Sequence, residues 1–202
     1  MQNIQYETHY NELVAFCNQS VLPKHKSSTT RPWILSIDGN IGAGKTTLLT
    51  LLEQDVDPRR VVILREPVDK WTQMIDPTDG QNLLQKYYEY PLVYSFMFQV
   101  VVMNTIMQSI DEAIAANPDC EILVCERSIA TSREVFAKLL HQTHQMTTFE
   151  YQVYESMFTP MVCERYYPDK TVFLDVPVKV CYERMKKRAR EGDSSEMTGW
   201  NF

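Results

Sequence analysis

The fold is decided by one stretch of the sequence, Gly39-Asn40-Ile41-Gly42-Ala43-Gly44-Lys45-Thr46. This stretch matches the pattern G-x-x-x-x-G-K-[ST], in which glycines let successive backbone N–H groups curl around phosphate groups. It lies between a short apolar run, residues 33–37, and a segment of helical character, residues 45–54. A strand, a glycine loop and a helix in this order predict a nucleotide-binding loop, whereas a chance glycine-rich turn would lack such a context.

Two side chains at the end of this loop carry the expected chemistry. Lys45 is expected to reach the β- and γ-phosphates of ATP, and the Thr46 hydroxyl is expected to bind Mg²⁺. The loop alone leaves open whether the γ-phosphate passes to water or to a metabolite.

Outward from the loop, apolar runs alternate with segments of helix length. The runs are short enough for buried parallel strands, and the alternation predicts an α/β fold with a parallel sheet flanked by helices. Residues 1–32 are polar and end in a loop-like stretch, so we interpret them as an N-terminal appendage to a single domain, residues 33–202. The predicted strands are 33–37, 61–64, 122–125 and 171–174, and the predicted helices are 45–54, 91–116, 149–164 and 177–190.

Composition narrows the class of protein. The chain has 202 residues, 44% of them hydrophobic, and a formal net charge of −6. Such a charge disfavours nucleic acid as a partner, and no apolar stretch is expected to span a membrane. The five cysteines are scattered and odd in number, which disfavours disulfides and a zinc site. These features favour the cytoplasm, or the host cytoplasm if the source is a virus.

Charged residues follow three of the predicted strands, at the sheet edge where ligands of parallel sheets bind. Glu66 follows the second strand, Glu126 and Arg127 follow the third, and Asp175 follows the fourth. Solvation at a strand end explains Asp175 adequately, whereas Glu66 and Glu126 share an edge with the phosphate loop. A phosphoryl transfer needs a base, a metal anchor and cations, and these residue types supply all three.

Together, these residues resemble the deoxynucleoside kinases, a family that includes deoxycytidine, deoxyguanosine and mitochondrial thymidine kinases. The similarity runs from about residue 33 to residue 193 with the motifs in the same order and spacing. It implies a P-loop kinase fold with a lid segment, and the short C-terminus predicts a viral or truncated member without the fifth strand of the family. The matching segments are Gly39–Thr47, Glu66-Pro67-Val68-Asp69-Lys70-Trp71, Asn82-Leu83-Leu84, Phe98-Gln99, Glu126-Arg127-Ser128 and Arg184…Arg188-Ala189-Arg190.

The resemblance implies catalytic roles that agree with the chemistry of the side chains. Glu66 would be the general base on the 5′-hydroxyl of a deoxynucleoside, with Arg127 beside it. Glu126 and Thr46 would hold Mg²⁺, and the loop residues through Thr47 would bind ATP. The cations expected around the ATP phosphates are Lys45, Arg184, Arg188 and Arg190.

The resemblance also implies a nucleoside pocket. In it Gln99 would hydrogen-bond the base edge, Phe136 would stack on the base, and Tyr88 would approach the 3′-hydroxyl. Trp71 would line the same pocket, although from the residues alone Trp71 and Phe136 are expected to be core aromatics. The lid glutamate that binds the 3′-hydroxyl in the family is replaced here by Asp193, which is one methylene shorter.

Two positions predict which bases are accepted. Family members that prefer deoxycytidine or purines carry an arginine and an aspartate where this chain has Ile106 and Ser132. Without that charged pair, the pocket has room for the thymine methyl group, and Gln99 can still pair with either pyrimidine. The resemblance therefore implies that thymidine and deoxycytidine are both substrates.

Two other functions remain open at this point, a nucleoside monophosphate kinase and a catalytically weak nucleotide-binding regulator. A monophosphate kinase needs extra cations for the phosphate of its substrate, and the region from Trp71 to Tyr88 is mostly neutral.

The helix at 91–116 carries more apolar residues than one side of a sheet needs, and the family dimerises through such helices. We therefore expect a homodimer.

Overall fold

The sheet of this protein is parallel and has four strands in the part of the chain that the structure describes. This computed structural model describes residues 2–19, 31–158 and 164–190. The strands have the order β2-β3-β1-β4, so the predicted parallel α/β fold is confirmed. Their bounds are β1 Trp33–Gly39, β2 Val61–Leu64, β3 Ile122–Glu126 and β4 Lys170–Leu174.

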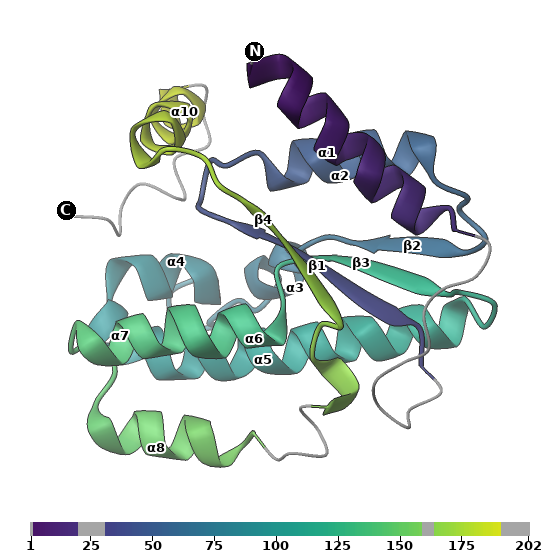
Figure 1. Ribbon diagram of the computed structural model, residues 1–202. Helices are drawn as coiled ribbons and strands as arrows, with labels where there is room; N and C mark the ends of the chain where they lie inside the picture. Colours follow the sequence, from purple (N-terminus) through teal and green to yellow (C-terminus); the bar gives the residue numbers. More distant parts are fainter. Residues whose placement is uncertain (1, 20–30, 159–163, 191–202) are drawn as a thin grey trace.

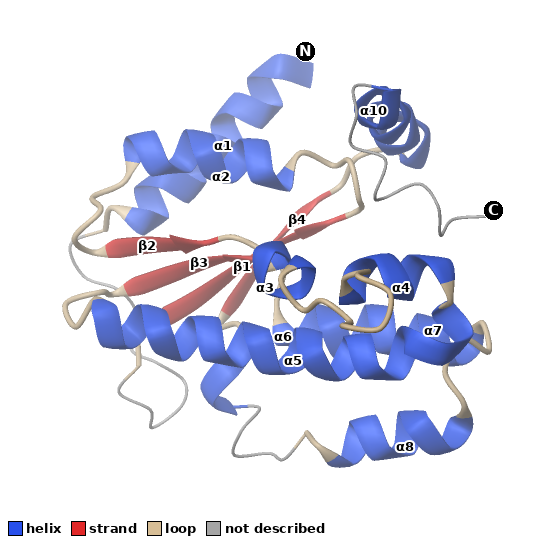
Figure 2. Ribbon diagram, turned by 180° about the vertical axis from the view of Figure 1, so that it is seen from behind, coloured by secondary structure: helices blue, strands red, loops and turns tan. Residues whose placement is uncertain are grey.

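The two central strands are apolar on both faces because helices cover both. Leu35 and Ile37 of β1 pack toward α1 (Gln2–Cys17) and α2 (Lys45–Asp55). Leu123 of β3 packs on the other face, in a cluster with residues of α5 (Pro91–Ala116). Figure 1 shows α1 and α2 on one side of the sheet and α5 on the other, and Figure 2 shows the same layers from behind.

Shorter helices extend the α5 layer beyond the sheet. Two of them begin with reciprocal capping boxes, Asn82 with Gln85 and Thr147 with Glu150, in which each side chain bonds the other residue's backbone N–H. The six-residue η1 is a π-helix, a rare form that is frequent at functional sites. The bounds are α3 Val68–Thr72, α4 Leu83–Glu89, α6 Ile129–Thr131, η1 Ser132–Ala137, α7 Lys138–Gln142 and α8 Thr148–Ser156. Helix α10, Val178–Arg190, lies instead on the side of the sheet where α1 and α2 lie (Figure 1).

The N-terminal segment contains a helix that shares the core of the domain. Leu13 and Cys17 of α1 are buried in the same cluster as β1 and α2. The Tyr10 hydroxyl donates to Asp55 at 2.6 Å. The part of α1 from Tyr10 to Cys17 therefore packs against the sheet domain, and the division of the chain at residue 32 stays a prediction.

Helix α5 corrects one expectation from the sequence. Its length and mean hydropathy of 1.3 are those of a membrane-spanning helix, whereas we expected no such segment. Eight of its residues are nevertheless buried in the domain, and they include Phe98, Gln99 and Met103. Its hydropathy reflects its contacts with the sheet and with the neighbouring helices α4, α6 and α8 and η1.

The predicted elements differ from the observed ones mainly at their ends. The helix expected at 149–164 ends at Ser156 as α8, and residues 159–163 lie outside the described residues. Strand β4 is an edge strand of the described sheet. The prediction about a fifth strand concerns the C-terminus, where residues 191–202 lie outside the described residues.

Candidate active site

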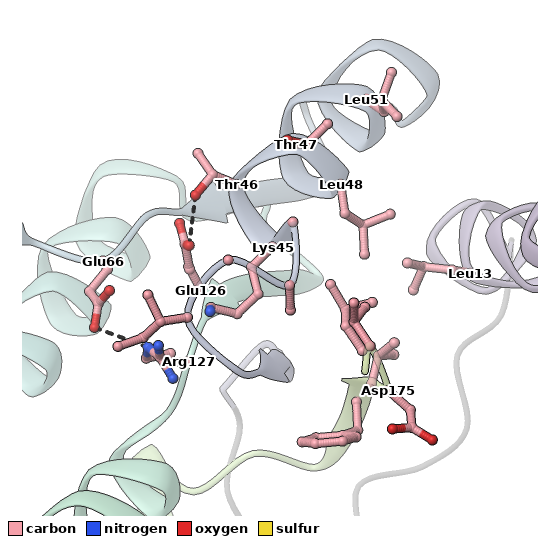
Figure 3. A pocket seen from close by; sticks show the side chains of 18 of the residues that line it. Leu13, Lys45, Thr46, Thr47, Leu48, Leu51, Glu66, Glu126, Arg127 and Asp175 are labelled. Carbon is pink, nitrogen blue, oxygen red and sulfur yellow. Dashed lines mark hydrogen bonds and ion pairs between the residues drawn. The ribbon is translucent and has the colours of Figure 1, made fainter. Parts of the chain in front are cut away.

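A large cleft lies at the carboxyl ends of the strands, where parallel sheets bind ligands. Its volume is about 1610 Å³, more than the 300–1,000 Å³ typical of pockets for small ligands. Figure 3 shows Lys45 near its centre, with Glu66 and Arg127 on one side and Leu48 and Leu13 on the other. The predicted residues that line it include Gly42, Gly44, Lys45, Thr46, Thr47, Glu66, Glu126, Arg127 and Arg184.

The phosphate-binding loop has the backbone that its glycines permit. Gly42 and Gly44 have φ angles of 79° and 100°, in the left-handed region that other residues rarely adopt. A Cβ atom at Gly42 would also lie 2.5 Å from the carbonyl oxygen of Cys181. Helix α10 therefore packs directly on the loop, which requires glycine at position 42.

Lys45 is buried at the start of α2, 6% exposed, with its ammonium group held across the loop. Its Nζ donates to the carbonyl oxygens of Gly39 at 3.2 Å and Asn40 at 3.0 Å. Burial lowers the pKa of Lys45, as does the charge of Arg127, while the nearby carboxylates of Glu66, Glu126 and Asp38 oppose that shift. The site thus surrounds one buried cation with three acids.

Thr46 and Glu126 lie together at the rim of the loop. The Thr46 hydroxyl donates to Glu126 Oε1 at 2.8 Å, as Figure 3 also shows. A hydroxyl and a carboxylate oxygen are both hard oxygen ligands, the kind that Mg²⁺ accepts from proteins alongside phosphate and water. The two residues fit a shared magnesium site.

Glu66 and Arg127 form an ion pair, with 3.3 Å between Oε1 and Nε. The Nε–H is not aligned for a hydrogen bond, so the contact is electrostatic. Arg127 has a φ angle of 65°, which is uncommon for a residue other than glycine and occurs often at functional sites. Its guanidinium lies 4.8 Å from the ring centre of Phe136.

Helix α10, which carries the arginines of the predicted lid segment, contacts the phosphate-binding loop through Arg184. Arg184 donates from Nη1 to the carbonyl oxygens of Gly42 and Ala43, both at 3.2 Å. The backbone of α10 continues to Arg190, but the side chains of Arg188 and Arg190 lie outside the described residues, as does Asp193.

Two of the predicted nucleoside residues, Gln99 of α5 and Ser132 of η1, are buried in contact with each other. Gln99 and Ser132 are 3% and 2% exposed, and the Ser132 hydroxyl donates to Gln99 Oε1 at 3.3 Å. The same hydroxyl lies 3.3 Å from that of Tyr154, and burial raises the pKa of Tyr154 to about 12. Ile106 is half-buried beside these residues.

Two aromatic residues of the predicted pocket lie in an apolar cluster. Trp71 is 4% exposed, meets the Phe98 ring edge to face, and donates its indole N–H to the Thr105 hydroxyl at 2.9 Å. Tyr88 packs partly against the same cluster and against the Tyr87 ring. Neither aromatic lines the cleft around Lys45, which agrees with the expectation from the residues alone that Trp71 is a core side chain.

The sequence reasoning missed two residues, Asp38 and Thr131, that link the phosphate-binding loop to the segment after Arg127. Asp38 is buried, 6% exposed, and accepts a hydrogen bond from the Thr131 hydroxyl at 2.6 Å. The position of Asp38, directly before the glycine loop, could have indicated a role for it from the sequence alone. Thr131 follows 93 residues later, and no local pattern connects the two.

The fold and cleft define a nucleotide-binding phosphotransferase of the P-loop class, because the loop, the lid helix and an acid–arginine pair meet at one sheet edge. The sequence profile described as Deoxynucleoside kinase matches residues 35–198. The chain belongs to this family, whose members phosphorylate deoxynucleosides with ATP as donor.

Curated relatives agree with this assignment. The probable deoxycytidine kinase of fowlpox virus is 29% identical over 187 residues, 92% of this chain and 71% of the relative. The mitochondrial deoxyguanosine kinase of Xenopus laevis is 29% identical, covering 80% of this chain and 66% of the relative. Human mitochondrial thymidine kinase 2 is 27% identical, covering 84% and 60%. The chain spans between 60% and 71% of the length of these relatives.

Proposed function

We propose that this protein transfers the γ-phosphoryl group of ATP to the 5′-hydroxyl of deoxynucleosides, with pyrimidines that include thymidine as preferred acceptors. One observation carries the proposal: the Glu66–Arg127 pair and the phosphate-binding Lys45 face one another in a single cleft. Phosphoryl transfer needs the attacking and leaving oxygens in line, so a base on one side of Lys45 and a nucleotide loop beneath it suit this reaction.

In this reaction each side chain does what its position allows. Glu66 accepts the proton of the attacking 5′-hydroxyl, and Arg127 orients the carboxylate and adds positive charge near the transferred group. Lys45 and Arg184 hold the charge that spreads over the phosphate oxygens, from below and from the lid. Arg188 and Arg190 are proposed to extend that set of cations along α10.

We propose that Thr46 and Glu126 hold one Mg²⁺ ion. When bound, the ion neutralises phosphate charge and positions the β- and γ-phosphates. The adjacent hydroxyl and carboxylate, 2.8 Å apart, support this proposal.

The preference for pyrimidines rests on Gln99, Ile106 and Ser132. Ser132 occupies one oxygen lone pair of the Gln99 amide and leaves its N–H₂ group to pair with a base. Ile106 packs against the apolar cluster that contains Tyr154, whose hydroxyl lies 3.3 Å from that of Ser132. An apolar pocket gains about 1–3 kcal/mol from a methyl group, so thymidine and deoxycytidine should differ modestly.

We also propose a homodimer that forms through α5. Near its N-terminal end Leu92 is 73% exposed, Val93 66% and Met97 51%, which is unusual for side chains of this kind. Such a strip is typical of a surface that a partner covers. Light scattering at micromolar concentration tests this directly, and a monomer mass would contradict it.

A coupled ADP-release assay tests the proposed reaction. The purified protein should release ADP when ATP and Mg²⁺ are combined with thymidine or deoxycytidine, more slowly with deoxyadenosine or deoxyguanosine, and not with thymidine monophosphate. Activity only with the monophosphate would identify a nucleoside monophosphate kinase. If the protein released no ADP with any of these acceptors, it would be a nucleotide-binding regulator.

A further inference from the structure

A buried carboxylate that takes no part in the proposed reaction connects the phosphate-binding loop to the segment that carries Glu126 and Arg127. Asp38 directly precedes Gly39, the last residue of β1. It accepts hydrogen bonds from the hydroxyls of Ser36 and Thr131. Each carboxylate oxygen accepts a hydrogen bond from one hydroxyl. A buried carboxyl group is costly unless it is hydrogen-bonded, so these two hydroxyls stabilise it.

The hydrogen bonds run in one direction, from Ser128 through Thr131 to Asp38. The Thr131 hydroxyl has one proton, which it donates to Asp38, so at the 3.1 Å contact between Ser128 and Thr131 the Ser128 hydroxyl must be the donor. Ser128 Oγ in turn accepts from the Thr131 backbone N–H as the N-cap of α6. Ser128, Thr131 and Asp38 thus form one chain of bonds, which we name the Asp38 brace.

Both ends of the Asp38 brace adjoin groups that act on phosphate. Gly39, the neighbour of Asp38, accepts hydrogen bonds at its carbonyl from Lys45 at 3.2 Å and from Arg127 at 3.4 Å. Ser128, at the other end, directly follows Arg127, whose backbone is held at a positive φ. The brace therefore adds a side-chain link between the loop that holds Lys45 and the segment that presents Glu126 and Arg127, beside the backbone hydrogen bond from the Arg127 N–H to the Ile37 carbonyl oxygen.

We propose that Asp38 and Thr131 are positioning residues for phosphoryl transfer, which keep the Arg127 segment in register with the phosphate-binding loop. Neither side chain touches the reacting atoms. Their effect is on geometry, and a misplacement of about 1 Å can lower a catalysed rate by about 10²-fold. ATP binds mainly through the loop itself, so loss of the brace should lower kcat and leave the binding of ATP nearly unchanged.

Isosteric substitutions test the brace. Thr131→Val keeps the shape but removes the hydroxyl, and kcat for thymidine should fall about ten- to a hundredfold while the KM for ATP changes less than about twofold. Thr131→Ser restores the hydroxyl and should recover most of the rate. Thr143→Val, which removes a hydroxyl that donates to the backbone of α7, serves as the matched control. Asp38→Asn breaks the same link and also removes a charge that acts on Lys45, so it should cost at least as much as Thr131→Val. The double variant should cost no more than Asp38→Asn alone.

The outcomes separate this inference from the proposed function on which it rests. Rates are measured per folded molecule, with thermal unfolding recorded for every variant, so a loss of stability alone does not count as a loss of kcat. A wild type that phosphorylates thymidine, with an equally active Thr131→Val, would overturn the brace alone. Equal losses in the Ser and Val variants, or additive losses in the double variant, would overturn it as well. A wild type that phosphorylates no deoxynucleoside would contradict both proposals.

Discussion

The donor half and the acceptor half of this active site are built in different ways. The donor half comes mainly from one continuous stretch, residues 39–47, which forms a strand end, a loop and a helix N-terminus, and Arg184 of α10 joins it. The proposed acceptor half takes Trp71, Gln99 and Ser132 from three separate helical segments. A contiguous motif reports its chemistry through its sequence, whereas a pocket gathered from distant helices reports its chemistry only through the fold.

The halves also differ in what surrounds their polar groups. Lys45 and Arg184 meet backbone carbonyl oxygens, which any sequence provides. Gln99 and Ser132 depend on each other and on Tyr154, so the side chains themselves set the pocket. Changes in the donor half should therefore slow the reaction with every acceptor, and changes in the acceptor half should alter the choice among acceptors.

Lys45→Ala should have the largest effect. The substitution removes the cation that meets the β- and γ-phosphates, which corresponds to several kcal/mol of transition-state stabilisation. kcat/KM should collapse for thymidine and deoxycytidine alike, while circular dichroism stays that of the wild type. Lys138→Ala, at an exposed position on α7, is the control and should keep full activity. Wild-type turnover in Lys45→Ala would show that the loop does not bind the donor.

Glu66→Gln should have the next largest effect. The amide keeps the shape of the side chain but cannot accept a proton, so the rate should fall about 10²-fold or more while the nucleoside still binds. Rates across neutral pH and the KM for thymidine give the two readouts. Glu164→Gln, an exposed position, should change neither. Equal rates for Glu66→Gln and wild type at every pH would exclude Glu66 as the base.

Ile106→Arg combined with Ser132→Asp should change selectivity more than rate. The charged pair fills the space that the thymine methyl group needs and presents charge to the exocyclic group of cytosine or a purine. The ratio of kcat/KM for thymidine to that for deoxycytidine should fall about tenfold, within the range expected for one methyl group. An undiminished preference for thymidine would show that other residues shape this pocket.

Thr105→Val should have the smallest effect on turnover and act on stability instead. The buried indole N–H of Trp71 would lose its acceptor, at a cost of about 1–3 kcal/mol. For a chain of this size each kcal/mol lowers Tm by about 2–4 °C. Thermal unfolding measures the shift, and an unchanged Tm would mean that the Thr105 hydroxyl does not stabilise the packing of Trp71.

The same contrast explains how much the sequence could predict. The four strands and the helices at α2, α5 and α10 follow from apolar runs and the glycine loop, and their ends agree within about two residues. Helix α1 was missed because the polar residues around Leu13 and Cys17 conceal the two side chains that reach the core. The π-helical η1 was missed because no sequence pattern distinguishes it from an α-helix.

Contacts across the sheet were beyond the sequence for a physical reason. Asp38 and Thr131 are brought together because β1 and β3 are neighbours, and that pairing is a property of the sheet order. Glu66 and Arg127 could be predicted to meet, since both follow strands that end at the same edge. The contact of Cys181 with Gly42 depends on how α10 packs, which no local pattern encodes.

The most direct test of the central claim is the phosphorus-31 NMR spectrum of the product formed from ATP and thymidine. If Glu66 activates the 5′-hydroxyl in line with a donor held at Lys45, the product is thymidine 5′-monophosphate, whose phosphorus signal is a triplet from the two 5′-protons. It should form only when ATP and thymidine are both present. A doublet from a 3′-phosphate, or inorganic phosphate as the sole product beside ADP, would contradict the joint action of the two halves.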